Sequence, residues 1–135
     1  MTQPIKVKRL KDVDSLTTHW QNYNRSEAGP GSSALLTTAL RCLSTGAVFA
    51  TIHDGSTIGF CCVEVDKHIG TVRGLPKDPG LGISGVCLSV LKSWAQGVDV
   101  NELQIVTENF NGSAFRYFEK TLGFQRKHIT FSTKV

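Results

Sequence analysis

The sequence predicts a single domain of the mixed α/β class, with a central sheet of about six strands and helices on both faces. The chain has 135 residues, which suits one domain of ordinary size. Short segments with alternating apolar residues, typical of strands, are interspersed with longer segments whose apolar residues recur at helical spacing. Strands joined through a helix favour parallel pairs and a tight turn gives an antiparallel pair, so the sheet expected over residues 1–135 is mixed.

The first elements along the chain are a strand and two helices. Residues 5–10 alternate apolar and basic side chains and predict a short strand. Asp12 can cap the helix that follows. The apolar residues on one face of that helix are Val13, Leu16, Trp20 and Tyr23. A loop rich in Gly, Ser and Pro covers residues 25–33, after which Ser32 or its neighbour can cap a second helix that Gly46 ends.

The middle of the chain predicts a hairpin and a further strand. Residues 47–53 and 57–66 are rich in β-branched residues, aromatic residues and cysteine. Asp54-Gly55 lies between them and is a strong signal for a tight turn. Residues 68–75 predict another strand, whose two glycines indicate a bulge or a close approach of the backbone to a neighbour.

The last part of the chain predicts a helix, a strand, a helix and a final strand. A strongly amphipathic helix begins at Ser84 and stops before Gly97. Residues 102–107 predict a strand, residues 111–122 a helix, and residues 125–133 the last strand.

The charge and hydropathy patterns exclude some classes of partner. The net charge is +4, and the basic residues are scattered instead of forming a stripe with interleaved aromatic residues, so we expect no nucleic-acid partner. A small anionic ligand suits this charge equally well. No apolar run approaches the roughly 20 residues that span a bilayer, and no apolar stretch follows the basic first residues. We therefore expect a cytoplasmic protein with no membrane partner.

The four cysteines predict neither a disulfide nor a metal site. They show no CxxC spacing and lie in apolar segments, as reduced thiols that pack as small hydrophobic groups do. The cysteines are Cys42, Cys61, Cys62 and Cys87. The adjacent pair would point to opposite faces of a strand.

The segment that points to chemistry is rich in glycine and lies between a predicted strand and the amphipathic helix at Ser84. It reads Leu75-Pro76-Lys77-Asp78-Pro79-Gly80-Leu81-Gly82-Ile83-Ser84-Gly85-Val86. Glycines let a backbone approach a ligand closely, and the first N–H groups of a helix, at the positive end of its dipole, suit a phosphate. The alternative is a flexible turn that only starts a helix.

Motifs on both sides of this segment carry a resemblance to a known family. The turn supplies Pro76, Gly80, Gly82 and Ser84, and the helix continues with Leu88, Leu91 and the pair Trp94-Ala95. After the next strand come Asn111, Ala114 and Phe118-Glu119-Lys120-Thr121-Leu122-Gly123-Phe124, in which Thr121 is one extra residue. In these motifs, and more loosely in its order of elements, the chain resembles the Gcn5-related N-acetyltransferases (GNAT).

The resemblance implies that the chain binds acetyl-CoA, or another acyl-CoA, as a co-substrate and needs no metal. The main-chain amides of residues 81–85 would hold the pyrophosphate. The pantetheine arm would pair with the strand edge before the turn, where a backbone N–H would polarise the acetyl carbonyl. The cofactor-binding residues implied in this way are Gly74, Leu75, Gly80, Leu81, Gly82, Ile83, Ser84, Gly85, Asn111, Ala114 and Phe118.

The sequence departs from the family pattern at three positions. Pro79 replaces the Arg or Gln expected before the first glycine, and Ser84 stands at the third glycine position. Phe118 occupies the position of a Tyr that many relatives are thought to use to protonate the leaving CoA thiolate. Tyr117 is the candidate acid in its place, although it would point about 100° away around a helix. Water can also protonate the thiolate after departure.

Candidates for the general base and for acceptor binding are less specific. Glu64 and Asp66 lie on the second strand of the hairpin, and Glu108 closes the later strand beside the implied cofactor cleft. Each could instead be a solvated carboxylate at a strand end. His68 could relay a proton. The loop after the first helix lies where relatives often recognise the acceptor, and its candidate residues are Tyr23, Arg25 and Glu27.

Three functions are compatible with these patterns. The first is an N-acetyltransferase that moves an acetyl group from acetyl-CoA to a primary amine, of a small molecule or a protein, by direct attack in a ternary complex. The second is a catalytically degenerate member of the same fold that binds an acyl-CoA as a sensor or partner module. The third is an unrelated mixed α/β interaction domain, in which the glycine run is a simple turn. Exposed sheet edges make a homodimer possible.

Overall fold

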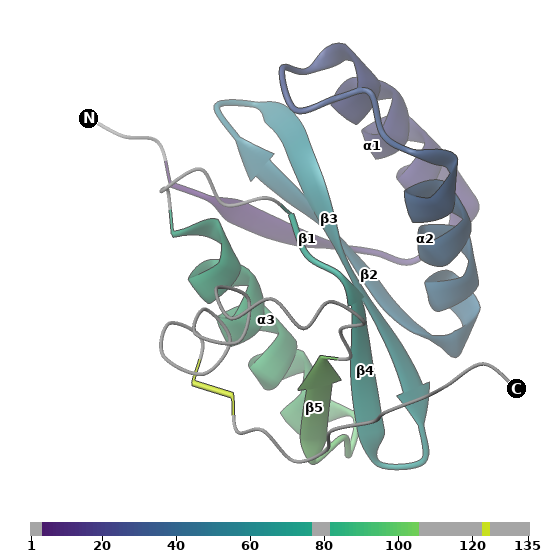
Figure 1. The fold of residues 1–135 in the computed structure, drawn as a ribbon, viewed down its shortest axis with the longest axis vertical. Coiled ribbons are helices and arrows are strands. Elements are labelled where there is room, and N and C mark those ends of the chain that lie inside the picture. The colour runs from purple at the N-terminus through teal and green to yellow at the C-terminus, as the bar shows by residue number, and fades with distance from the viewer. Residues whose placement is uncertain (1–3, 77–81, 106–122, 125–135) are drawn as a thin grey trace, which may run out of the picture.

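The structure is a computed structural model that describes residues 4–76, 82–105 and 123–124, and these form a five-stranded sheet with helices on both faces (Figure 1). The elements are β1 (Lys6–Leu10), α1 (Val13–Arg25), α2 (Ser33–Thr45), β2 (Gly46–His53), β3 (Ser56–Asp66), β4 (Ile69–Gly74), α3 (Ile83–Gly97) and β5 (Glu102–Ile105). The predicted fold class is confirmed. The predicted helix at 111–122 and the sixth strand at 125–133 lie outside the described residues.

The strands are ordered in the sheet as they are in the chain, from β1 to β5. β4 and β5, which α3 connects, are parallel, as expected. The pair β1 and β2 is antiparallel, although helices connect these strands too, so the expectation of a parallel pair is wrong there. The reason is that two helices intervene: α1 leads the chain away and α2 brings it back, so β2 starts beside the end of β1 and Leu10 pairs with Val48.

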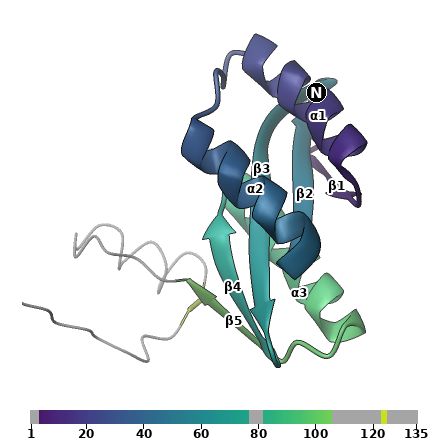
Figure 2. The ribbon, with the colours of Figure 1, turned by 90° about the vertical axis from the view of Figure 1, so that its right-hand side faces the viewer.

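The sheet separates two hydrophobic cores. α1 and α2 cover one face and α3 covers the other (Figure 2). The core under α1 and α2 contains Leu10, Leu16, Ala39, Cys42, Val48, Ala50, Phe60 and Cys62. The core under α3 contains Ala47, Phe49, Cys61, Val63, Val72, Ile83, Cys87 and Leu91. The adjacent residues Cys61 and Cys62 therefore face opposite cores, as the alternation of a strand requires.

The helices on the first face begin where their capping residues predict. An Asp12 carboxylate oxygen accepts a hydrogen bond from the amide of Ser15 at 2.7 Å. The Ser32 hydroxyl accepts one from the amide of Leu35 at 3.1 Å. Each bond satisfies an amide that the helix itself leaves without an acceptor. One residue of the apolar pattern differs: Val13, at the very start of α1, is 56% exposed.

The turn between β2 and β3 is the two-residue hairpin that its sequence predicts. His53 pairs with Ser56, and both residues between them have positive φ, 51° at Asp54 and 76° at Gly55. This backbone matches the twist of the flanking strands, and glycine and aspartate tolerate it better than other residues.

The four cysteines all lie in the described part of the chain, are buried and form no disulfide. Burial raises the pKa of the Cys62 thiol to about 12. Burial likewise raises the pKa of Cys42. These thiols therefore stay protonated near neutral pH and pack as small apolar groups, as expected.

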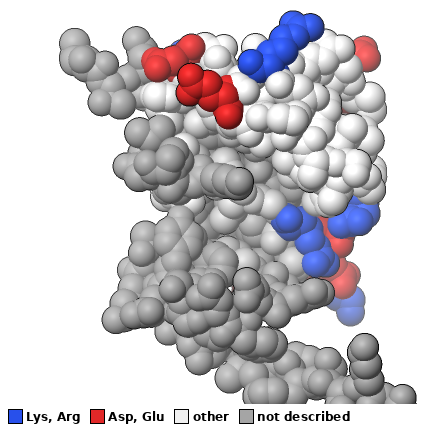
Figure 3. All heavy atoms as spheres, turned by 45° about the horizontal axis from the view of Figure 1, so that its top comes forward, with Lys and Arg blue, Asp and Glu red and all other residues white. Residues whose placement is uncertain are grey.

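The described residues lack two features that mark other classes of protein. None of the helices described is both long and apolar enough to cross a membrane. No group of three or more His, Cys, Asp or Glu side chains in that part of the chain is arranged to hold a metal ion. On the face drawn in Figure 3, the described Lys and Arg side chains do not form one continuous stripe.

Candidate active site

The N-terminus of α3 lies at the end of the glycine-rich segment. Gly82 is the N-cap residue, with a left-handed backbone (φ 73°, ψ 21°) that favours glycine, and its carbonyl accepts the amide of Val86 at 3.3 Å. Ser84 is buried, whereas Gly82 and Gly85 are exposed. No described atom lies within 4 Å of a Cβ placed on either glycine. Among the described residues, nothing therefore crowds the first turn of α3 at these two exposed glycines, as a site for an approaching anion requires.

The strand that leads into this segment contains a bulge. Val63 of β3 pairs with Val72 of β4, and Cys62 pairs with Gly74, so Arg73 is the extra residue. A Cβ placed on Gly74 would lie 3.7 Å from Leu35 and 3.8 Å from the sulfur of Cys62, on the face that α2 covers. The bulge thus turns two successive residues of β4 toward the same face. The described pairing of β4 with β5 ends at Val72 and Ile105, before this point.

The other glycine of β4 marks a close approach. A Cβ placed on Gly70 would lie 3.0 Å from the side chain of Leu103 and 3.1 Å from that of Val63. The sequence predicts a bulge or a close approach from these two glycines, and the structure contains both, one at each glycine.

Pro76 fixes the start of the segment against the sheet. It is buried, and a Cβ on Gly59 of β3 would clash with its ring. The glycine at position 59 therefore leaves the room into which Pro76 packs. Leu75, between Pro76 and the bulge, packs against the core under α3. The chain is thus anchored up to residue 76, and the helix that follows begins at Ile83.

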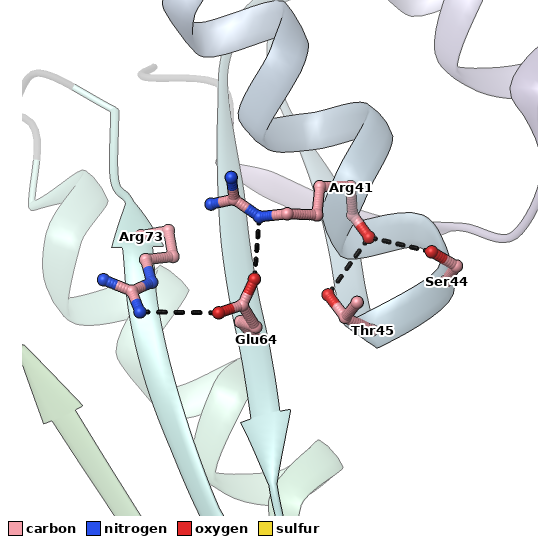
Figure 4. Close-up of polar contacts among 5 residues, drawn as sticks. All are labelled: Arg41, Ser44, Thr45, Glu64 and Arg73. Carbon is pink, nitrogen blue, oxygen red and sulfur yellow. Dashed lines mark hydrogen bonds and ion pairs between the residues drawn. The ribbon is translucent and has the colours of Figure 1, made fainter.

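Glu64 lies between two arginines on the face that α2 covers (Figure 4). One carboxylate oxygen accepts a hydrogen bond from Nε of Arg41 at 2.7 Å, and the other accepts one from a terminal nitrogen of Arg73 at 3.4 Å. The hydrogen bond from Arg41, with the charges of both arginines, holds the pKa of Glu64 below its ordinary value. A carboxylate in this position is a weaker base than a solvated one.

The candidate acceptor residues lie at the end of α1 and just after it, and they differ in how far they are buried. The Tyr23 ring is half-buried, 5.4 Å from the Phe60 ring and 5.7 Å from that of Trp20 between centroids. Tyr23 is therefore part of the packing under α1. Arg25 and Glu27 are exposed. The structure does not bring these residues together with Glu64 through any hydrogen bond or ion pair among the described residues.

Several of the predicted site residues lie outside the described residues. These are Gly80, Leu81, Glu108, Asn111, Ala114, Tyr117 and Phe118.

Sequence reasoning missed Arg41 and Arg73. They stand 23 and 9 residues from Glu64 in the chain, and no local spacing connects them. The only signal was a charged residue beside Gly74, in a strand whose glycines indicate a bulge or a close approach of the backbone. That signal does not predict which side chain Arg73 contacts, because the pairing of strands across the sheet decides which side chains lie next to each other.

No protein-family model matches the sequence, and no curated protein matches it significantly. Solved structures do match. An aminoglycoside N-acetyltransferase, AAC(6')-Iy, solved in complex with CoA, has a TM-score of 0.69 at 17% identity, over 99% of this chain and 97% of that one. The ribosomal-protein-S18-alanine N-acetyltransferase from Escherichia coli has a TM-score of 0.68 at 20% identity, over 93% and 80%.

A third similar structure has a different function in its name. It is a transcriptional regulator from Bacillus halodurans C-125, with a TM-score of 0.64 at 13% identity, over 98% of this chain and 100% of that one. Since one fold hosts different functions, likeness at these identities shows the fold and not the activity. The chain therefore has the fold of the Gcn5-related N-acetyltransferases.

Proposed function

We propose that the protein is an N-acetyltransferase that moves an acetyl group from acetyl-CoA to a primary amine, which attacks directly in a ternary complex. The observation that carries the proposal is the N-terminus of α3, where Gly82 has a left-handed backbone and no described atom meets a Cβ on Gly82 or Gly85. Two of the similar structures are N-acetyltransferases by name, and one was solved with CoA, which supports the same reading.

The diphosphate of acetyl-CoA would lie against the first turn of α3. The positive end of a helix dipole stabilises an anion there, by about 0.3–1 kcal/mol at an exposed site. Glycines at this turn let the phosphates approach the backbone itself. In this proposal Gly80 and Leu81 complete the turn; Ser84, at the third glycine position, is buried, whereas Gly85 is exposed.

The pantetheine arm would run along β4 after its bulge. Gly74 lies beyond the last described pair of β4 and β5. The edge of β4 that faces β5 therefore has no described strand partner at Gly74, and main-chain groups on that edge can serve a ligand. The amides of Gly74 and Leu75 would then pair with the arm and polarise the acetyl carbonyl. Asn111, Ala114 and Phe118 would line the other side of the cofactor.

Acetyl-CoA supplies the acetyl group as an activated thioester, so the protein has to orient the two reactants and manage one proton. The amine nitrogen forms a bond to the carbonyl carbon, the carbon–sulfur bond breaks, and the proton lost by the amine goes to a base or to water. We propose Glu108 as the base and Tyr117 as the acid for the departing thiolate. Glu64 is the weaker candidate for the base, because Arg41 and Arg73 lower its pKa.

A pair of tryptophan substitutions tests the cofactor site. Gly85 and Gly97 lie near opposite ends of α3, and a Cβ on either meets no described atom within 4 Å. A helical side chain extends back toward the N-terminus, so the indole of Gly85→Trp would cover the first turn. We expect Gly85→Trp to weaken binding of acetyl-CoA at least about tenfold in calorimetry. Gly97→Trp, the matched control, should bind like the wild type.

The same proteins distinguish the proposal from a non-catalytic acyl-CoA sensor. Saturation with acetyl-CoA at a hundred times its Kd should stabilise the wild type by about 2.7 kcal/mol. An enzyme then releases CoA thiol when a panel of primary amines is added. An aromatic disulfide reagent, which the released thiol cleaves to give a coloured thiolate, can follow the release, because the cysteines of the chain are buried. Stabilisation without thiol release would favour the sensor, and equal binding by Gly85→Trp would refute the phosphate site.

A further inference from the structure

Arg41, Glu64 and Arg73 form a cluster from three elements, α2, β3 and β4 (Figure 4). Each oxygen of the Glu64 carboxylate serves one arginine, at 2.7 Å for Arg41 and 3.4 Å for Arg73. One carboxylate and two guanidinium groups leave the cluster with a net positive charge. The Glu64 side chain is 27% exposed, which places the cluster at the surface of the sheet and not in its core.

Most of the guanidinium donors in the cluster remain available. Arg41 uses Nε for Glu64, and Figure 4 shows its two terminal nitrogens pointing away from the carboxylate. Arg73 uses one terminal nitrogen. The described residues offer no further acceptor to either side chain, and the two are 49% and 41% exposed. A guanidinium presents five N–H donors whose fork matches a carboxylate or a phosphate.

The cluster adjoins the place where the acetyl group would be presented. Arg73 is the bulge residue and precedes Gly74, so their Cα atoms lie about 3.8 Å apart. Both residues face the side of the sheet that α2 covers. An acceptor whose amine reaches a thioester beside Gly74 on this face therefore lies on the same side of the sheet as the two guanidinium groups. A charged group a few bonds from that amine is directed toward them in this proposal.

We propose that Arg41 and Arg73 bind an anionic group of the acceptor, so that the acceptor is a small amine that carries a carboxylate or a phosphate; this inference rests on the proposed function. Glu64 holds the two guanidinium groups in place and attracts the ammonium form of the incoming amine. The alternation of positive, negative and positive charge complements a zwitterion. A polycationic acceptor such as an aminoglycoside meets net repulsion at the same place.

Matched acceptor pairs test this inference. L-phenylalanine and phenethylamine differ only in the carboxylate, and O-phosphoethanolamine and ethanolamine differ only in the phosphate. With saturating acetyl-CoA, we expect kcat/KM of the wild type to be at least about tenfold higher for the anionic member of one pair. Which pair shows the preference distinguishes a carboxylate acceptor from a phosphate acceptor. Equal values within both pairs would overturn the inference.

Substitutions separate recognition from a structural role. Arg41→Gln and Arg73→Gln should each remove the preference and leave kcat/KM for the neutral amine within about twofold, whereas Arg73→Lys should retain part of it. Lys92→Gln removes one charge from an exposed position on α3 and should change neither value. Glu64→Gln keeps an oxygen that can accept a hydrogen bond from an arginine and loses the negative charge, so it should retain the preference for the anionic acceptor. Two results for Arg73→Gln would contradict recognition by the cluster. One is an equal fall in kcat/KM for both members of a pair, and the other is a fall in kcat/KM for the neutral amine alone.

Direct binding keeps the inference distinct from the proposed function. If the wild type neither binds acetyl-CoA nor releases thiol, the proposed function fails. Calorimetric titration with L-phenylalanine and O-phosphoethanolamine, without acetyl-CoA, then still decides the inference. Binding of either by the wild type that Arg73→Gln weakens about tenfold or more supports the cluster as an anion site. Absence of binding, or equal binding by both proteins, overturns it.

Discussion

His19 connects α1 to the start of β3 through a side-chain hydrogen bond. Its Nδ1 lies 2.9 Å from the hydroxyl of the buried Thr57, whose amide donates to the side chain of Asn22 at 2.6 Å. Burial, and to a smaller extent the charge of Lys8, lowers the pKa of His19. The folded protein therefore holds this imidazole neutral at a pH where the unfolded chain protonates it.

The lowered pKa predicts acid-sensitive stability. The folded state binds fewer protons at His19 than the unfolded state, so the free energy of unfolding should fall as the pH drops below about 6.5, the value for an unperturbed histidine, toward the lower folded value. In His19→Gln, an amide takes the place of the imidazole and the fall between pH 7.5 and pH 5.5 should be smaller. Urea unfolding at several pH values measures this. Identical pH profiles for the two proteins would contradict the assigned environment of His19.

Single residues were predictable from sequence where their role is local. The caps at Asp12 and Ser32 accept hydrogen bonds from amides three residues away, so the local sequence is enough to predict them. The partners of Glu64 lie 23 and 9 residues away and meet it only through the sheet. No local rule could supply them, and the sequence left Glu64 open between a base and a solvated carboxylate.

At the scale of elements, the connection between α1 and α2 packs closely onto α1. The amide of Gly31 donates to the side chain of Asn24 at 2.8 Å. A Cβ on Gly31 would clash with the ring of Trp20 and lie 2.8 Å from that of Tyr23. Since these rings pack in turn against the buried Phe60, they have little room to move away.

Two alanine substitutions should have opposite effects. Gly31→Ala places a methyl group against the rings and should destabilise the fold by about 1–3 kcal/mol, as overpacking does. Gly97→Ala, at the end of α3, meets no described atom and should stabilise it by up to about 1 kcal/mol through better helix propensity. Thermal or urea unfolding measures both. A stable Gly31→Ala would show that the rings accommodate the methyl group.

The three described helices, the first hairpin and the five described strands were predicted close to their observed bounds, because periodicity and turn residues act within a few positions. The glycines of β4 predicted a bulge or a close approach of the backbone, but not which residue is the extra one, since register is a property of the pair β3 and β4. The antiparallel pairing of β1 with β2 was predicted wrongly, because the rule for one intervening helix was applied where two intervene.

At the scale of the whole molecule, β4 contributes side chains to both faces of the sheet and leads the chain from one face to the other. After Val72, which faces the core under α3, the bulge turns Arg73 and Gly74 toward the face of α2. The chain then passes Pro76 and reaches the first turn of α3 on the other side. One bulge thus lets β4 contribute to the proposed acceptor site on the face of α2, while the chain after it leads to the proposed phosphate site on the face of α3.

An amide-by-amide titration tests the proposed cofactor site most directly. When acetyl-CoA is added to ¹⁵N-labelled protein, the largest NMR shift changes should occur at Gly82, Ile83 and Gly85 and at Gly74 and Leu75, because the proposal places the diphosphate and the pantetheine there. Saturation of those shifts should give the Kd that calorimetry measures. Changes confined to α1 and α2, or no change at millimolar acetyl-CoA, would contradict the account.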